Sequence, residues 1–500
     1  MSVLHEDKER KIIPRWRGFY TTLEIGELYP IHVLKKRRPI PNDILAIKRK
    51  EWEENHSISF AADLMSTGVA FGEEDCVKDA AEFILSNNMR LSETTKAIAN
   101  HVLKVKPKEK LGDNEIESDE FSVRRQIHDL RLQLYDEPRN SFLWTNIALL
   151  YASLGFAEQS THAIEVALSL APQNRFVLRS SARLFVHIDD YKRAHNILRY
   201  SDNVKHDPWL LAAEIAVAGT AHRTSRFIKN AINILEFMNF SPFHVSELAS
   251  ALSTLDFEAG NLKHGRKHLK MSLKQPTENS VAQAAWLERK FFGVRVEQFE
   301  KQRPMSHEAL AWDFCRKTKW NDTVVESLKW LNDQPFSSRP AILGSYISAV
   351  SLGEYEKSAN IAHRGLIANP KDFTLLNNLA FALGHIGRLK DAREVFGRIR
   401  ESTLSTEEKF VSLATKGFLC YREGNVAGGR KLYLEALEKG RKGVDEKRRA
   451  SAFLWMTMEE LRIGSEESCK YKREVLDFAK ILPYPDLRPL INRVEKHKGS

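Results

Sequence analysis

Cysteine is scarce in this sequence, and the cysteines that occur are far apart. They are Cys76, Cys315, Cys420 and Cys469, with no Cys-x-x-Cys pair among them. This spacing argues against a disulfide framework and against a zinc module, and it favours a reducing compartment. The chain also lacks an apolar run close to the ~18 residues that a membrane span needs, and it begins with charged residues where a secretory signal is apolar. We therefore expect a cytoplasmic protein without membrane insertion.

Catalytic signatures are missing as well. No G-x-S-x-G elbow occurs, and the stretch HEALA at 307–311 lacks the second histidine of a zinc-protease helix. The glycines of GNVAGGRK at 424–431 follow a helical pattern, whereas a phosphate-binding loop follows a strand. His264 and His268 have the i, i+4 spacing of a metal pair, but the lysines and arginines around them repel a divalent cation. We expect no enzymatic activity, no catalytic residues, no metal site and no cofactor.

Positive charge is in excess, with a formal net charge of +10. Two basic clusters stand out: Lys35, Lys36, Arg37 and Arg38, and then Lys263, Lys267, Lys270 and Lys274. The second cluster follows helical spacing opposite an apolar edge. A solvated convex face is its first interpretation, and contact with an acidic partner or with nucleic acid is the second. Basic and aromatic residues are not interleaved as base stacking requires, which makes nucleic acid the second choice.

The stretch NNLAFALGHIGRLKDAREVF, residues 377–396, indicates a helical hairpin too small to bury its own apolar side. Its landmarks recur with a period of about thirty-four residues. Small residues recur where two helices must approach closely: Ala148, Ser160, Ala182, Ala194, Ala380, Ala392 and Gly429. Glycines, which accept a left-handed conformation, recur at the turns: Gly155, Gly353, Gly387 and Gly424. We expect each hairpin to cover the apolar side of the next.

The best copy of the repeat, residues 141–174, resembles the tetratricopeptide repeat family. Its residues at the signature positions are Trp144, Ile147, Ala148, Tyr151, Ile164, Ala167 and Pro172. The resemblance implies an all-α fold, a tetratricopeptide-type α-solenoid in which antiparallel helix pairs form a right-handed superhelix. The confident copies are 141–174, 175–208, 339–372, 373–406 and 410–443, and the weaker ones lie near 245–278 and 305–336.

The copies suggest how the chain is divided. Residues 1–110 are expected to form a basic N-terminal region with an irregular start, which holds short strands in GFYTTLEI and IHVLKK and then helices. Residues 111–280 contain the first run of repeats, 281–304 an irregular connecting helix, and 305–443 the second run. Residues 444–500 supply a further helix pair and a solvated closing helix.

In the tetratricopeptide family, the exposed sides of the first helices line an inner groove. The resemblance places Arg179, Arg183 and His187 there in the first run, and Asn377, Phe381, His385, Phe418, Tyr421 and Arg422 in the second. Three basic groups along one edge suit a carboxylate-rich peptide or a phosphate chain, and a solvated face paired with acids is an equal alternative. For Phe381 and Phe418, packing between hairpins is as well supported as ligand contact.

These features favour a non-catalytic protein–protein interaction scaffold or adaptor, which binds an acidic or amphipathic partner segment in its groove. A nucleic-acid-associated factor and a ligand-controlled regulatory protein are the alternatives. The sequence specifies neither the partner nor the oligomeric state.

Overall fold

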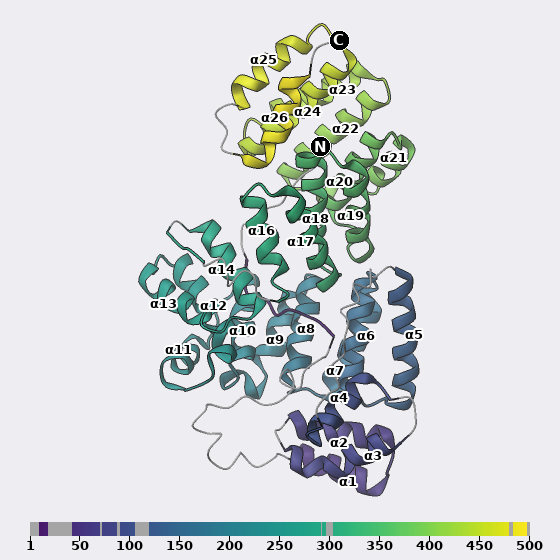
Figure 1. Cartoon of the computed structure of the whole chain (residues 1–500), viewed down its shortest axis with the longest axis vertical. Coiled ribbons are helices and arrows are strands. Elements are labelled where there is room, and N and C mark those ends of the chain that lie inside the picture. The colour runs from purple at the N-terminus through teal and green to yellow at the C-terminus, as the bar shows by residue number, and fades with distance from the viewer. Residues whose placement is uncertain are drawn as a thin grey trace. The chain divides into compact units, whose positions relative to one another are not determined.

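The computed structural model of the chain describes residues 10–18, 43–70, 73–87, 91–105, 120–291, 293–296, 304–479 and 484–497. Helices make up nearly all of the regular structure in these ranges, and the described residues contain no strand (Figure 1). The strands expected at 18–25 and 31–36 lie outside the described residues, except for Gly18. The all-α prediction is therefore confirmed.

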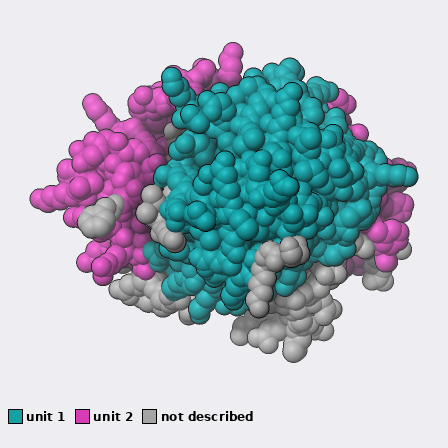
Figure 2. All heavy atoms as spheres, turned by 90° about the horizontal axis from the view of Figure 1, so that it is seen from above, with its two compact units in different colours: residues 1–8, 307–500 teal, residues 9–306 magenta. Residues whose placement is uncertain are grey.

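The chain divides into two compact units, which are coloured separately in Figure 2. Unit 2 is formed by residues 9–306, and unit 1 by residues 307–500 together with residues 1–8. The boundary falls at the start of the second run of repeats. Each unit is a series of helix pairs, and each is described by itself below.

Unit 2 begins with helices that precede the first regular copy and continues through the first run of repeats. Its helices are α1 (Asp43–Glu54), α2 (Ile58–Ala70), η2 (Glu74–Val77), α3 (Lys78–Ser86), α4 (Glu93–Val102), α5 (Glu120–Asp136), α6 (Ser141–Ser153), α7 (Ala157–Leu170), α8 (Arg175–His187), α9 (Tyr191–Arg199), η3 (Asp202–Lys205), α10 (Pro208–Thr220), α11 (Ile228–Phe237), α12 (Pro242–Glu258), α13 (Leu262–Ser272) and α14 (Glu278–Lys290).

Unit 1 contains the second run and the C-terminal helices. They are α16 (His307–Arg316), α17 (Trp320–Asp333), α18 (Ser338–Ile347), the π-helical turn η4 (Ser348–Leu352), α19 (Tyr355–Ala368), α20 (Phe373–Ile386), α21 (Leu389–Gly397), η5 (Glu401–Thr403), α22 (Thr406–Arg422), α23 (Val426–Lys439), α24 (Glu446–Ile463), α25 (Ser468–Ala479), η6 (Pro485–Leu487) and α26 (Arg488–Lys496).

Every predicted copy coincides with a helix pair whose two helices pack on each other. These pairs are α6–α7, α8–α9, α12–α13, α16–α17, α18–α19, α20–α21 and α22–α23. The sequence period did not reveal the pair α10–α11, whose helices are joined by the long turn at 221–227. First helices of successive pairs also pack on one another, as α6 on α8, α10 on α12 and α20 on α22 do. The chain is therefore an α-solenoid within each unit.

The small residues predicted at helix crossings are buried at those crossings. Ala148, Ala182 and Ala392 have no exposed surface. The hydroxyl of Ser160 donates to the carbonyl of Ala148 at 2.7 Å, so the small residue at this position also joins α7 to α6 by a hydrogen bond. A side chain at Gly429 would lie 2.9 Å from the carbonyl oxygen of Gly417, which is closer than a Cβ can approach.

The turns between paired helices use the left-handed conformation that the glycines allow. Gly387 has φ +92° at the C-terminus of α20, and Gly155 has φ +72° after α6. Thirty-four residues after Gly155, Asp189 has φ +63° at the equivalent turn. Aspartate tolerates this conformation better than most residues because its short side chain bonds locally, here to the hydroxyl of Tyr191 at 2.6 Å. The Ser405–Glu408 capping box that the sequence indicates is present at the start of α22.

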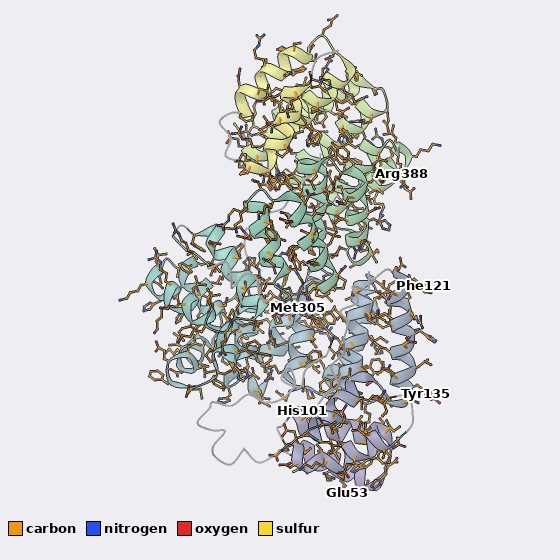
Figure 3. The ribbon with its side chains drawn as sticks, in the orientation of Figure 1. Glu53, His101, Phe121, Tyr135, Met305 and Arg388 are labelled. Carbon is orange, nitrogen blue, oxygen red and sulfur yellow. The ribbon has the colours of Figure 1, made fainter. Side chains whose placement is uncertain are left out.

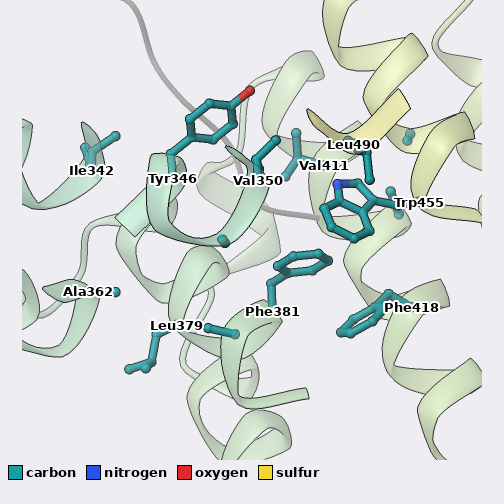
Figure 4. Packing of buried hydrophobic residues seen from close by; sticks show 14 of the residues in the cluster. Ile342, Tyr346, Val350, Ala362, Leu379, Phe381, Val411, Phe418, Trp455 and Leu490 are labelled. Atoms are coloured by element: carbon teal, nitrogen blue, oxygen red, sulfur yellow. The ribbon is translucent and has the colours of Figure 1, made fainter. Parts of the chain in front are cut away.

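The C-terminal helix α26 is part of the core of unit 1. Leu490 and Val494 are fully buried, and Figure 4 shows Leu490 beside Trp455. Asp486, just before α26, accepts a hydrogen bond from the Tyr346 hydroxyl at 2.6 Å. This apolar side packs on both α24 and η4, while Arg488, Asn492, Glu495 and Lys496 on the other side of α26 are exposed.

Close helix approach makes a specific prediction about Gly365 in α19. An alanine methyl group there would meet the Cβ of Ala341 and lie 2.8 Å from a methyl of Leu375. Gly365→Ala is expected to lower the free energy of unfolding by about 1–3 kcal/mol through overpacking. Gly397→Ala is the matched control, because nothing lies within 4 Å of its added methyl group, and it should change stability by less than about 0.5 kcal/mol. Urea denaturation measures the unfolding free energy of both variants. Equal values would contradict the close approach of the helices at Gly365.

Candidate functional site

Residues 10–17, with the sequence RKIIPRWR, form an extended segment without secondary structure that lies on unit 2 (Figure 1). We call this segment the strap. The strap contacts α10 and α12, which are the first helices of their pairs, and it also contacts α14. We call the side of unit 2 formed by these three helices the strap face. Burial alternates along the strap, with Arg10, Ile12, Pro14 and Trp16 buried and the intervening residues half-buried. This period of two is typical of an extended chain with one side against a surface.

Two buried side chains of α14 hold the main chain of the strap. The side-chain amide of Asn279 donates to the carbonyl of Ile13 at 3.0 Å, and that of Gln283 donates to the carbonyl of Arg10 at 2.7 Å. Gln283 also donates to the hydroxyl of Thr254 on α12 at 3.0 Å, which fixes its orientation. These bonds recognise an extended backbone, and they do not depend on the side chains that it carries.

The charged groups of the strap meet acidic or polar groups of the face. The Lys11 ammonium lies 2.5 Å from both carboxylate oxygens of Glu258, at the C-terminal end of α12. The Arg10 guanidinium donates to Gln283 at 2.5 Å and to Asn279 at 3.1 Å. Arg17 pairs with Glu278. Every one of these contacts matches a cation on the strap with an oxygen on the face.

Glu278 shows the electrostatic effect of the strap. Burial alone would raise the pKa of its carboxyl group, but the charges of Arg17 and Arg15 outweigh this and lower the pKa. The carboxylate is therefore ionised at neutral pH, although it is mostly enclosed. A lowered folded-state pKa stabilises the folded chain above the usual carboxyl pKa, and this contribution is lost as the pH falls through the folded value.

The apolar anchors of the strap are Ile12, which is 1% exposed, and Trp16, which is completely buried. Burying one large apolar side chain contributes about 1.5–3 kcal/mol. Ordering the backbone of one residue costs about 1–2 kcal/mol, so the anchors offset the ordering of the segment only together with its polar contacts. Pro14 lowers this cost because its ring fixes φ and also restricts Ile13 to an extended conformation.

The strap face extends beyond α14. A methyl group at Gly219, near the end of α10, would lie 3.3 Å from Cε of Lys11, so this glycine leaves room for the lysine stem. At the other end, the space beside Gly18 is bordered by the side-chain oxygen of Asn146 on α6, at 3.9 Å from an added methyl group. The chain thus follows the first helices of the solenoid over several pairs.

Of the predicted groove residues in the first run, Arg179 forms an internal ion pair. Its guanidinium lies 2.6 Å from the carboxylate of Glu247 on α12 and 4.9 Å from the ring centre of Trp209 on α10. The side chains of Arg179 and Glu247 are only 12% and 6% exposed. Arg179 is therefore paired with a neighbouring acid, which is the alternative that the sequence left open. Its contacts also connect three successive helix pairs, through α8, α10 and α12.

His187 is not a cationic group near neutral pH. Burial, and to a smaller extent the charge of Arg183 one turn earlier on α8, lower its pKa to about 4. The sequence predicted three basic groups along this edge, but His187 is neutral there. Only Arg179 and Arg183 carry charge at this edge.

The predicted groove residues of the second run lie mostly inside unit 1. Phe381 and Phe418 have no exposed surface, and their ring centres are 4.7 Å apart (Figure 4). Packing between hairpins is thus their role in this structure. Asn377 is fully buried and accepts from Thr415 at 2.7 Å, and Tyr421 is buried with its hydroxyl on Glu460.

His385 and Arg422 belong to the same cluster. The His385 ring stacks on Tyr355, with ring centres 4.0 Å apart, and Nδ1 lies 3.0 Å from the Arg422 guanidinium. Burial, followed by the charge of Arg422, holds the pKa of His385 well below its usual range. Arg422 also pairs with Glu459 at 2.6 Å, so its charge is balanced within unit 1.

The basic clusters differ in what the structure describes. Lys35, Lys36, Arg37 and Arg38 lie outside the described residues. On α13 and just after it, Lys263, Lys267, Lys270 and Lys274 are all exposed. Lys267 forms an ion pair with Glu236 at 3.0 Å. This arrangement is the solvated face that the helical spacing indicates, and a partner for it stays a prediction.

The motifs that resemble catalytic or metal sites have structural roles. Asn425 caps α23 by accepting from the backbone of Gly428, so GNVAGGRK is a turn and a helix start. His268 bonds to Asp256 at 2.7 Å, while His264 is exposed. The described part of the chain holds no group of three or more His, Cys, Asp or Glu side chains placed to bind a metal ion. Among the same residues, no helix is both long and apolar enough to cross a membrane.

Sequence reasoning missed the residues that make the strap face. Asn279 and Gln283 are four residues apart in ENSVAQAAWLERK. From Val281 to Leu287, all residues except Gln283 are apolar. Two amides on one side of such a helix are a signal for buried polar contacts, because an unpaired buried amide is unfavourable. The sequence interpretation placed residues 281–304 in an irregular connecting helix outside the repeats, and this signal was therefore not connected with a site.

The internal ion pair of Arg179 makes a prediction about charge reversal. Arg179→Glu leaves Glu247 buried beside a second carboxylate, and it should lower the free energy of unfolding by about 3–5 kcal/mol. Lys270→Glu, at an exposed position of α13, is the control and should stay within about 0.5 kcal/mol of the wild type. Denaturant unfolding compares them, and a stable Arg179→Glu protein would show that this arginine is not a structural ion-pair partner.

The lowered pKa of His187 predicts a pH effect. As the pH falls from about 6.5 to about 4, the unfolded chain takes up a proton at this position and the folded chain does not, so stability decreases over this window. His187→Gln removes this contribution, and its unfolding free energy should fall less steeply between pH 7 and pH 4.5 than that of the wild type. Parallel curves for the two proteins would contradict the assignment.

No family model matches the chain, and no curated protein matches it. Among solved structures, it is similar to the crystal structure of the APC/C hetero-tetramer Cut9–Hcn1, with a TM-score of 0.37 and 9% identity over 90% of this chain and 92% of that chain. It is also similar to yeast Tom70, with a TM-score of 0.31 and 11% identity over 91% of each chain. Similarity of this size identifies no function.

Proposed function

We propose that this chain is a non-catalytic protein–protein interaction scaffold, which holds an extended segment of a partner on the strap face of unit 2. One observation carries the proposal: an extended stretch of polypeptide already lies on this face. Its backbone is bound by Asn279 and Gln283, and its buried side chains are covered by the helices.

The chemistry of the strap face favours a polypeptide over a nucleic acid. Glu258 and Glu278 are its charged contacts with the strap, and carboxylates repel a phosphate backbone. Asn279 and Gln283 present amide donors that match the carbonyls of an extended chain. The acidic partner expected from the sequence does not suit this face, because the groups that it offers are acidic or neutral.

The proposal predicts that partner binding depends on the two amides of α14. Asn279→Ala combined with Gln283→Ala removes both bonds to the bound backbone. This variant and its reference both carry Ile12→Ala and Trp16→Ala, because an intact strap uses the same two bonds and would be weakened together with the partner. Each such bond contributes about 1 kcal/mol, so we expect partner affinity to fall by about tenfold to thirtyfold. The measurement is affinity purification from the native cell, followed by quantitative mass spectrometry of the associated proteins.

A matched control is available in unit 1. Asn369 donates to the carbonyl of Phe336 at 3.1 Å and to that of Gly365 at 3.1 Å, so Asn369→Ala removes the same kind of bond away from the strap face. This variant, made in the same strap-weakened chain, should keep the partners of that reference, and thermal unfolding checks that all three proteins are folded. Identical partners for the strap-weakened reference, the control and the α14 variant would refute the strap face as the binding site.

A further inference from the structure

The strap is part of the chain itself, and it covers the strap face over its whole described length. We propose that the strap face takes partner segments with the chemistry of the strap, namely extended, basic and bearing buried isoleucine-like and tryptophan-like side chains, and that the strap is their competitor. This inference rests on the proposed function, and it adds the partner's chemical class and a means of regulation.

The charge pattern defines the class of partner. Lys11 and Arg17 are matched by Glu258 and Glu278, and the Arg10 guanidinium is matched by the side-chain oxygens of Asn279 and Gln283. These groups are spaced to meet cations at the first, second and eighth positions of an eight-residue segment. An acidic segment would place carboxylates against Glu258 and Glu278, so it is excluded by like-charge repulsion.

The apolar contacts define the register. Ile12 and Trp16 are buried four residues apart, with Pro14 buried between them. In an extended chain, every second residue points to the same side, so Ile12, Pro14 and Trp16 all face the helices. A partner must therefore have its aliphatic and aromatic residues four positions apart. A shift by one residue would turn both of these apolar side chains away from the helices.

The form of the strap makes exchange possible. It has no hydrogen bonds of its own secondary structure. Its anchors are backbone carbonyls and side chains that a second segment can supply equally well. By contrast, α26 in unit 1 is a helix with Leu490, Ile491 and Val494 in the core, and its removal would open the fold. A covalently attached strap has a high effective concentration, so it reduces the apparent affinity of any competing segment.

The test measures binding of a dye-labelled peptide of sequence RKIIPRWR to three full-length proteins by fluorescence anisotropy. They are the wild type, the strap-weakened variant Ile12→Ala with Trp16→Ala, and a control variant, Phe121→Ala with Tyr135→Ala. The control removes apolar groups of α5 that are 74% and 86% exposed and lie at the two ends of that helix (Figure 3). If the strap-weakened protein does not fold, Lys11→Glu replaces it, because this change removes the pair with Glu258 at a half-buried position.

We expect the strap-weakened variant to bind the peptide at least tenfold more tightly than the wild type and the control do. The charge-reversed peptide EEIIPEWE should bind none of them. Adding RKIIPRWR to the wild type should increase amide hydrogen exchange in residues 10–17, because the strap is displaced. Equal affinity for wild type and strap-weakened variant, or unchanged exchange of the strap, would overturn the competition.

Two further outcomes separate this inference from the proposed function. If the peptide fails to bind the strap-weakened variant while partner recovery still depends on Asn279 and Gln283, the partner class is wrong and the scaffold role stands. If partner recovery does not depend on them either, both proposals fail. A wild-type protein that is a dimer by light scattering, and a monomer after Trp16→Ala, would assign the strap to a second copy and contradict competition within one chain.

Discussion

The close approach of two helices at a small residue is the constraint on which this structure depends. At Ala148, Ala182 and Ala392 the side chain has no exposed surface, and at Gly429 no side chain fits at all. Only such contacts let a short hairpin present a continuous apolar side to the next hairpin. The solenoid of each unit, and the row of first helices within it, follow from this repeated crossing.

Within each unit, that row is covered by a segment from near one end of the chain. In unit 1 the cover is α26, whose apolar residues complete the core around Trp455. In unit 2 it is the strap, which is held by Asn279, Gln283 and a few ion pairs. The physical difference is in the backbone: α26 is a helix that bonds its own backbone groups, whereas the described bonds to the strap backbone come from side chains of α14. A helix that belongs to a core is fixed, whereas an extended segment with separate anchors can be replaced by another of the same chemistry.

Charge has a different role inside the molecule from the one that its total suggests. The sequence carries +10, yet the described basic residues that seemed suited to a ligand are largely paired. Arg179 neutralises Glu247, Arg422 neutralises Glu459, and His187 is uncharged at neutral pH because it is buried. The acidic groups of the strap face, Glu258 and Glu278, are paired with cations that the strap supplies. Local pairing, and not net charge, therefore sets the electrostatic character of each described face.

Periodicity in the sequence was sufficient to predict the all-α class, the helix pairs, the small-residue crossings and the glycine turns, because these depend on contacts within one hairpin, and the same pattern of residues recurs about every thirty-four positions. It was insufficient for the α10–α11 pair, where the turn is long, and for the site. Whether Phe381 faces a partner or a neighbouring hairpin depends on α24, which is far away in sequence. The contact between Arg10 and Gln283 joins residues 273 positions apart, and no local pattern encodes it. Tertiary structure alone brought the strap and α14 together.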